Sequence, residues 1–384
     1  MAHYKAGRMH DAVQAQVAAL NAAAARNGPG APEDVEDLSR LGLFLFALGD
    51  HAAAVTAMER ARTVAPRDPE VLANLGVVLT RSGRYEDAIR TYLEARRLAP
   101  EDPNVLDGLA TAHGDGGKFE ESHRYGEESL AMKDRQAMGA MKDRQSTGSG
   151  GGPPDEPPRR FDPARPEQNV IAFSLWGDAP RYLDGALRNV EAADRLYPGW
   201  RCRFYLDPTV PEGTVKQLAS GGVDIVRMPR HRNFYEGLFW RFRVAEDDTV
   251  RRFLVRDCDA VINPREQAAV EEWLSSDRYF HVMRDYYTHT ELILAGLWGG
   301  VGGILPIGKL ITDFTRSGAG GAIVRTIDQI FLRRMVWPLV RGSLMTHDAR
   351  HRVLGAQDFP SHATLPAGRH VGQDDDAVRN RLAK

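Results

Sequence analysis

A step of 34 residues recurs through the first third of the chain and limits that part to stacked copies of one structural unit. Two sets of residues follow the step: Leu41, Leu75, Leu109 and Gly49, Gly83, Gly117. A fixed period of this length is typical of repeat proteins, in which each unit covers the apolar face of its neighbour. The sequence therefore predicts a repeat domain over residues 1–130.

Small residues and prolines keep the same step, as the pairs Ala54 and Ala88, Ala61 and Ala95, and Pro66 and Pro100 show. The pattern resembles the tetratricopeptide repeat, in which small residues let paired helices pack closely and a proline closes the second helix. The resemblance implies a helical domain with a concave surface that recruits a protein, either the acceptor of a reaction or a partner. Self-association through the same repeats is the alternative.

The repeat pattern ends near residue 130, where the composition changes. Residues 131–165 contain MKDRQ twice, followed by a stretch rich in Ser, Gly and Pro. Such a composition does not bury enough apolar surface to become ordered. We expect a flexible linker over residues 131–165.

Charge and cysteine content exclude several classes of protein. The formal net charge is −2, from 50 basic and 52 acidic residues, so no overall field attracts nucleic acid or an anionic membrane. Cys202 and Cys258 are too few for a disulfide framework, and no apolar stretch is long enough to span a membrane. These features favour a cytoplasmic protein without a transmembrane segment.

Strand and helix patterns alternate from Asn169 onward. The predicted strands are NVIAFSLW, WRCRFYLD, VDIVRMP, RRFLVRDCDAVI and YFHVMRD, with helical patterns between them. This alternation predicts a mainly parallel sheet covered by helices, in a domain over residues 166–384. Ligands of such sheets bind at the carboxyl ends of the strands.

Asp257 and Asp259 stand two apart at the end of one of these strands. Successive strand side chains alternate between faces, so both carboxylates can project to one side while Cys258 points to the other. Paired carboxylates can hold a hard divalent cation, which in turn neutralises a diphosphate. The other interpretation is an ordinary Asp-x-Asp triplet that ends a strand at a solvated turn.

The flanking residues resemble a bacterial group of glycosyltransferase-like proteins of the GT-A type. The resemblance rests on the ordered segments FSLWG, YPGW, RFY, FWRF, VRDCDAVINPRE, AAVEEW, FHVMRD and DQIFL. It implies a Rossmann-like GT-A domain that binds a nucleotide sugar, with Asp257 and Asp259 as its metal-binding pair. Ala260 departs from it, because a small hydroxyl residue is expected there.

Further site residues are expected beside the aspartate pair, one of them from the resemblance. His347 is similar to a late histidine that supplies a third metal ligand, and imidazole with carboxylates suits Mn²⁺ better than an all-oxygen set; Mg²⁺ is the other candidate. Asp328 and Gln329 are expected to face the transferred sugar, and Asp285 to bond sugar hydroxyls or act as base. A surface histidine, a first-turn acid and a structural cap are the respective alternatives.

Donor contacts are expected from aromatic and basic residues. Arg241 and Arg284 are candidates for donor phosphate or sugar, because a planar guanidinium binds an oxyanion bidentately. Trp176 and Gly177 are expected to shape the nucleobase pocket. Trp240 is a further donor-binding candidate, although tryptophan is often simply part of the core.

Taken together, these features predict a metal-dependent glycosyltransferase that moves a sugar from a nucleotide-sugar donor to a hydroxyl acceptor. Two alternatives remain open. One is an inactive transferase-like domain on a protein-binding scaffold, which is suggested by Ala260 because the expected hydroxyl side chain is missing there. The other is a nucleotidyl or phosphoryl transferase, although the sequence has no Gly-rich phosphate loop of the GxxxxGK type.

Overall fold

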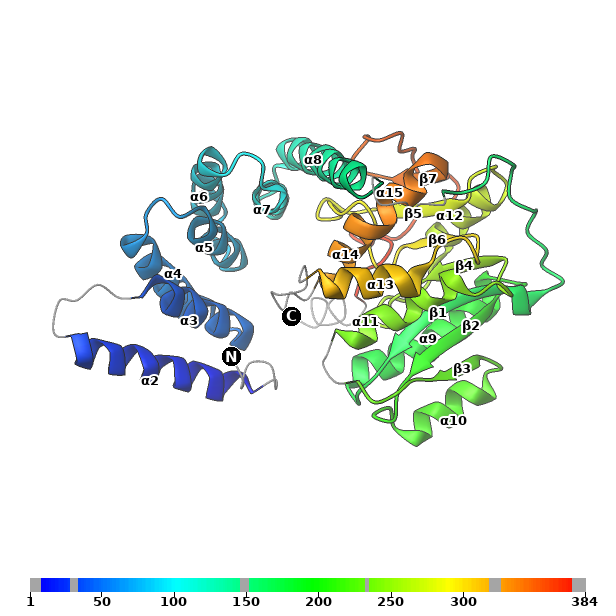
Figure 1. Ribbon diagram of the computed structural model, residues 1–384, viewed down its shortest axis with the longest axis horizontal. Helices are drawn as coiled ribbons and strands as arrows, with labels where there is room; N and C mark the ends of the chain where they lie inside the picture. The colour runs from blue at the N-terminus through cyan, green and yellow to red at the C-terminus, as the bar shows by residue number, and fades with distance from the viewer. Residues whose placement is uncertain (1–7, 28–33, 146–151, 232–234, 318–325, 375–384) are drawn as a thin grey trace. The chain divides into compact units, whose positions relative to one another are not determined.

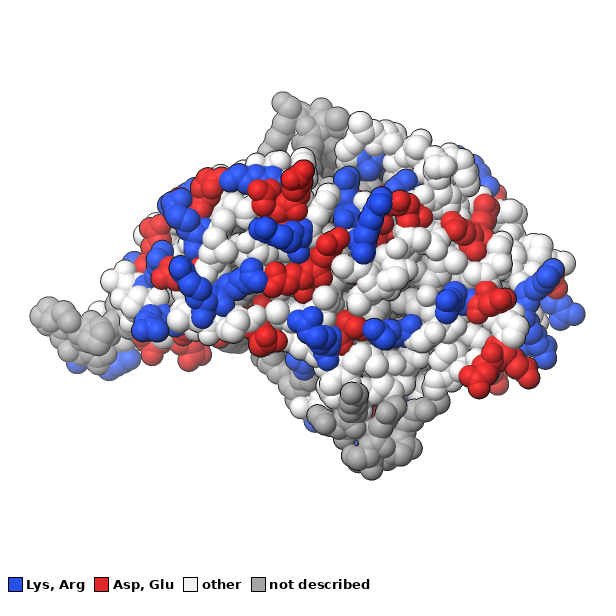
Figure 2. Space-filling view, turned by 90° about the horizontal axis from the view of Figure 1, so that it is seen from above, with Lys and Arg blue, Asp and Glu red and all other residues white. Residues whose placement is uncertain are grey.

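The computed structural model describes residues 8–27, 34–145, 152–231, 235–317 and 326–374. The chain divides into two compact units, Met1–Met132 and Lys133–Lys384. None of the helices within those ranges has the length and apolar character needed to cross a membrane. Basic and acidic side chains are intermixed on the face drawn in Figure 2, as the small net charge leads one to expect.

The first unit consists of helices that pair in sequence order (Figure 1). They are α2 Met9–Asn27, α3 Val35–Leu48, α4 His51–Val64, α5 Pro69–Arg81, α6 Tyr85–Leu98, α7 Pro103–Asp115 and the beginning of α8 Phe119–Gln145. The first helix of each repeat starts after an aspartate whose side chain accepts a hydrogen bond from the backbone of the first turn, and these caps are Asp34, Asp68 and Asp102. The helical repeats expected from the sequence are confirmed.

The recurring residues have separate physical roles. Gly49, Gly83 and Gly117 have φ of 89°, 75° and 78°, a left-handed conformation that turns the chain between paired helices. Tyr92 is buried between neighbouring helices, where an added Cβ at Gly76 or Gly108 would lie 2.6 Å or 2.3 Å from its ring. The 34-residue step therefore arises from two requirements, the geometry of the turns and the packing of the helices.

The linker predicted from residue 131 begins too early, because α8 continues to Gln145. Lys133 is fully buried and donates to the Thr290 carbonyl (2.9 Å) and to Glu291 (3.0 Å). Asp134 accepts from the Trp337 indole (2.8 Å) and from Arg341 (2.7 Å). Ala, Met, Lys, Arg and Gln are strong helix formers, so the two MKDRQ segments continue the helix although their composition is poor in apolar residues. Residues 146–151 of the predicted linker lie outside the described ranges, and residues 152–165 form neither helix nor strand.

The second unit is built around a seven-stranded sheet of order β3-β2-β1-β4-β6-β5-β7 (Figure 1). The strands are β1 Asn169–Leu175, β2 Arg201–Leu206, β3 Asp224–Arg227, β4 Arg252–Val255, β5 Phe280–Arg284, β6 Trp298–Gly300 and β7 Leu344–Asp348. Pairing is parallel except at β6, which runs antiparallel to both β4 and β5. The expected mainly parallel sheet is confirmed, while the short reversed strand β6 was not expected.

Helices connect the strands of the second unit. They are η1 Pro166–Gln168, α9 Pro180–Leu196, α10 Glu212–Ser220, α11 Glu236–Trp240, η2 Arg241–Glu246, α12 Pro264–Leu274, α13 Ile307–Arg316, α14 Ile327–Phe331, the π-helical η3 Leu332–Val336, α15 Trp337–Val340 and η4 Arg341–Ser343. Buried strand residues such as Ile171, Phe204 and Leu254 share one core with Ala186 of α9 and Trp273 of α12. This core fixes the carboxyl ends of β1, β2 and β4.

Candidate active site

A cavity of about 510 Å³ opens at the carboxyl ends of β1 and β4. These two strands are neighbours, and the order of the sheet changes direction between them, since β2 and β3 follow β1 on one side while the later strands follow β4 on the other. Such a switch point is where open α/β sheets bind ligands. The lining includes Trp176, Arg181, Asp257, Asp259 and Asp328.

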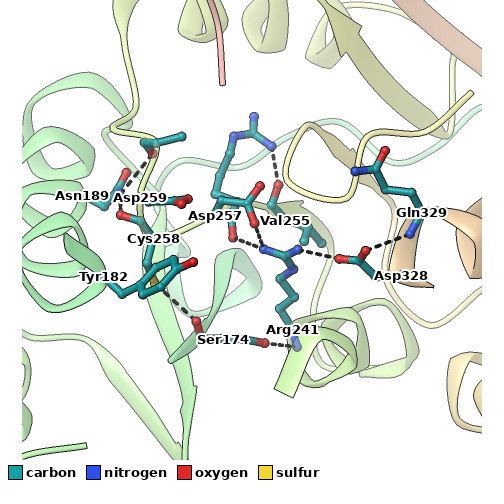
Figure 3. Close-up of polar contacts among 12 residues, drawn as sticks. Ser174, Tyr182, Asn189, Arg241, Val255, Asp257, Cys258, Asp259, Asp328 and Gln329 are labelled. Atoms are coloured by element: carbon teal, nitrogen blue, oxygen red, sulfur yellow. Dashed lines mark hydrogen bonds and ion pairs between the residues drawn. The ribbon is translucent and has the colours of Figure 1, made fainter. Parts of the chain in front are cut away.

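The loop that carries the two aspartates is held from behind by α9. The Asn189 amide donates to the carbonyls of Cys258 (3.3 Å) and Ala260 (3.2 Å), and its oxygen accepts from Ile262 N (3.1 Å). Gly185 lets the helix approach closely, because an added Cβ would lie 2.0 Å from the Cys258 carbonyl oxygen. These contacts, part of which appear in Figure 3, fix the loop so that both carboxylates face the cavity.

Arg241 joins the two sides of the cavity (Figure 3). Its guanidinium donates to Asp257, to Asp328 (3.2 Å) and to the Arg256 carbonyl (3.0 Å). Its backbone N–H donates to Ser174 Oγ at the end of β1 (3.0 Å). Asp257 is 44% exposed and Asp328 is largely buried at the cavity wall, so Arg241 is a fixed positive charge between the two carboxylates.

Asp328 lies in the first turn of α14 beside the cavity. Burial raises its pKa to about 6; Arg241 opposes this rise, and the charge of Asp257 adds to it. The Gln329 N–H donates to Asp328 Oδ1 (2.9 Å), so the two residues are placed together at the cavity wall. A carboxyl group with a pKa in this range can hold or accept a proton near neutral pH.

Asp259 faces the cavity opposite Arg181. Burial and then the charge of Asp257 raise the pKa of Asp259 to about 6. Arg181 Nη2 donates to Asp259 Oδ2 (2.8 Å) and to the Tyr182 hydroxyl (2.6 Å). The arginine also lies over the Tyr182 ring, 4.4 Å from its centroid.

The two carboxylates have the chemistry that the expected divalent cation requires. Carboxylate oxygens suit Mg²⁺ and Mn²⁺, and Mg²⁺ commonly binds one or two carboxylates together with substrate phosphates. A cation bound to both groups would remove the repulsion that contributes to the raised pKa of Asp259. Within the described residues, no group of three or more His, Cys, Asp or Glu side chains is placed to hold a metal. The two carboxylates therefore fit a cation whose remaining ligands are phosphate oxygens or water.

The aromatic wall of the cavity contains Trp176, which packs edge-on against Trp240 with ring centroids 6.0 Å apart. Trp176 and Gly177 line the cavity, whereas Trp240 is buried behind them. The Gly177 N–H donates to Thr209 Oγ1 (2.7 Å), and Thr209 in turn bonds to the buried carboxylate of Asp207. The end of β2 thus supports the loop after β1.

Asp207→Asn is expected to destabilise the protein by about 2 kcal/mol at neutral pH. Burial alone would raise the pKa of Asp207, but hydrogen bonds from Thr209 and His231 lower it to about 2. The carboxylate therefore contributes stability that is fully present above the unfolded-state pKa of about 4 and is lost as pH falls toward 2.

Urea unfolding of both proteins between pH 7 and pH 3 measures this effect. The difference in unfolding free energy should shrink below about pH 4. The matched control is Asp313→Asn on the exposed face of α13, where a change within about 0.5 kcal/mol is expected. A difference that is constant with pH would contradict the assignment.

Three candidate residues lie away from the cavity. Arg284 is fully buried and donates to Asp348 (2.6 Å) and to the Leu292 carbonyl (3.1 Å). Asp285 accepts from Arg265 and from Val371 N (2.9 Å). Neither lines the cavity, because β6 separates β5 from β4.

His347 is the third of these residues. It lies on β7, three strand positions or about 14 Å from β4. Its Nδ1 is 2.8 Å from His281 Nε2, and its Nε2 is 3.2 Å from Glu272. The structure does not bring His347 to the two aspartates.

Sequence reasoning missed three residues that shape the site: Arg181, Asn189 and Asp207. Arg181 stands in the first turn of the helix after β1, a position from which a side chain can reach the carboxyl end of the sheet. That placement was a usable signal. Asp207 gave a similar signal, because it ends the predicted strand WRCRFYLD. Asn189 gave none, because a buried amide looks the same in sequence as an exposed one.

The comparisons with known proteins concern mainly the first unit. Residues 39–103 match the family model of the tetratricopeptide repeat. The resemblance seen in the 34-residue step is thereby confirmed over those residues. No curated protein sequence matches the chain.

Several solved structures are similar. A mutant of the Thermobaculum terrenum O-GlcNAc transferase is 20% identical, with a TM-score of 0.45, over 66% of this chain. This chain covers 44% of that transferase, less than half its length. MamA (19% identity, TM-score 0.31) covers 35% of this chain and matches over 74% of its own. YrrB, described as a TPR protein with an unusual peptide-binding site, is 16% identical over 37% of this chain and 69% of its own, with a TM-score of 0.31.

Proposed function

We propose that the second unit is a metal-dependent glycosyltransferase, which moves a sugar from a nucleotide-sugar donor to a hydroxyl acceptor. One observation carries the proposal: Asp257 and Asp259 share a cavity of about 510 Å³ at the switch point of the sheet with an aromatic wall and a second acidic side. The volume is within the range of small-molecule sites. The ordered GT-A-like sequence segments support the same assignment.

Different residues of the cavity bind different parts of the donor. Trp176 stacks on the base, and Gly177 lets the backbone come close to the nucleotide. Asp257 and Asp259 would hold Mn²⁺ or Mg²⁺. When bound, that cation stabilises the negative charge that develops on the nucleoside diphosphate as it leaves.

Asp328 and Gln329 face the sugar from the other side of the cavity. Arg241 keeps Asp328 beside the reacting centre and holds Asp257 at the correct place for the cation. The raised pKa of Asp328 suits a group that handles the proton of the acceptor hydroxyl. Donor and acceptor would therefore meet between the aspartate pair and α14.

Hydrolysis of nucleotide sugars, compared with nucleoside triphosphates, tests the proposal. Slow release of sugar from one nucleotide sugar, dependent on Mn²⁺ or Mg²⁺ and abolished by chelator, is expected. Turnover of triphosphates alone would favour the nucleotidyl or phosphoryl transferase. Binding of a nucleotide without any turnover would favour the inactive scaffold for which Ala260 is the motive.

The repeats are proposed to recruit a protein, either the acceptor or a partner. Leu43 of α3 and Val77 of α5 occupy equivalent positions of successive repeats, and both are exposed large apolar side chains. Stacked repeats present such positions along one extended surface. Binding the acceptor there would raise its local concentration near the transferase.

Leu43→Glu with Val77→Glu is expected to lower sugar transfer to proteins of a cell lysate about ten-fold while leaving donor hydrolysis unchanged. Labelled donor measures both. The matched control is Val64→Glu, because Val64 is 39% exposed and Val77 is 40% exposed, but Val64 ends α4, the second helix of its pair. Equal loss in both variants, or no loss in the double variant, would show that this surface does not deliver substrate.

A further inference from the structure

We infer that Arg181 is a mobile counter-ion of the proposed cation site, which neutralises Asp259 in the ligand-free protein and binds the donor diphosphate once a cation is present. The inference rests on the proposed function. It adds a ligand-binding role for a residue that sequence analysis did not select. It also predicts effects of opposite sign on cation and nucleotide binding.

The contacts of Arg181 place its charge on the cavity side of the aspartate loop. Its Nη2 bonds to Asp259 and to the Tyr182 hydroxyl, and its Nη1 lies 3.5 Å from Asp374. All of these partners are side chains. Its Nε is buried and has no hydrogen-bond partner in the described part of the chain.

Arg181 is more exposed and less firmly held than Arg241, the other arginine that bonds to the aspartate pair. Arg241 is 4% exposed and is fixed by a backbone carbonyl as well as by two carboxylates. Arg181 is 36% exposed and, within the described residues, its side chain bonds to no backbone group. A side chain with only side-chain partners can change partner without disturbing the loop.

Charge balance explains why the change of partner is needed. A divalent cation bound by Asp257 and Asp259 has its charge matched by those two carboxylates. Each phosphate of the donor brings a further negative charge into the cavity. The Arg181 guanidinium, which would leave Asp259 when the cation binds, lines the same cavity and can bind those oxygens bidentately.

Arg181 and the cation compete for Asp259, and this competition determines the expected effect of replacing Arg181. Arg181→Gln should bind Mn²⁺ alone about three-fold more tightly, because a partly exposed ion pair opposes cation binding only modestly. The same variant should bind nucleoside diphosphate, in the presence of Mn²⁺, about ten-fold more weakly. Arg181→Lys keeps the charge and should show wild-type Mn²⁺ affinity with part of the nucleotide affinity restored.

Electron paramagnetic resonance of free Mn²⁺ measures the first constant on the full chain. Titration calorimetry with UDP, GDP, CDP and ADP measures the second. The matched control is Arg195→Gln, an exposed arginine of the same helix that donates to the Glu191 carbonyl in the preceding turn (3.4 Å). Thermal unfolding establishes that each variant is folded.

The outcomes separate the inference from the proposed function. Tighter Mn²⁺ with weaker nucleotide binding in Arg181→Gln alone supports the inference. Unchanged or weaker Mn²⁺ binding by Arg181→Gln, or unchanged nucleotide binding, overturns the inference. If the wild-type protein binds Mn²⁺ in the same experiment, the proposed function still stands. A wild-type protein that binds no Mn²⁺, with or without nucleotide, overturns both.

Discussion

Asp259→Asn is expected to reduce donor hydrolysis on the order of a thousand-fold. The substitution removes one charge of the Asp257–Asp259 pair while keeping the shape of the side chain. The surrounding loop should persist, because Asn189 holds it through the carbonyls of Cys258 and Ala260. Release of sugar from the donor at saturating Mn²⁺ measures the effect.

A control separates this loss from a general loss of charge. Asp313→Asn removes an exposed carboxylate from α13 in the same unit and should retain wild-type hydrolysis. Circular dichroism should show the same helix content in both variants. Full hydrolysis by Asp259→Asn, or undiminished activity of the wild type in chelator, would contradict a cation site at this pair.

Arg284→Met is expected to destabilise the protein by about 3–5 kcal/mol, because it leaves the buried carboxylate of Asp348 without its charged partner. The pair joins β5 to β7, and both side chains are fully buried. Urea unfolding measures the loss. Nucleotide affinity per folded molecule should not change, because Arg284 lies outside the cavity.

A second variant distinguishes a structural from a donor-binding arginine. Arg284→Met with Asp348→Leu removes both charges and should recover a large part of the lost stability. If nucleotide affinity instead falls ten-fold or more in the folded fraction of Arg284→Met, the arginine contacts the donor after all.

The aspartate pair could be predicted because its position depends on local pattern. An apolar strand followed by two acids places carboxylates at the carboxyl end of a sheet, whichever neighbours the strand acquires. The helical repeats could be predicted for a similar reason, since each residue of the 34-residue step serves a turn or a contact with the adjacent helix. Both inferences needed no knowledge of long-range pairing.

The placement of Arg284, Asp285 and His347 depended on such pairing and could not be predicted. β6 is the three-residue strand Trp298–Gly300, too short to give a period, yet it enters between β4 and β5. That insertion moves β5 and β7 away from the cavity, and with them every candidate residue at their ends. Arg241 and Asp328 are 87 positions apart in the sequence, and no local pattern predicts their contact.

The way Asn189 and Asp207 hold their loops has a consequence for the evolution of this unit. Both act from behind the cavity, through backbone groups or through Thr209, and neither lines it. Loop shape is therefore encoded separately from the side chains that meet the ligand. Substitutions at Trp176, Tyr182 or Gln329, which line the cavity, can change which ligand it accepts while the loops beneath them keep their form, so new specificities can arise through single substitutions.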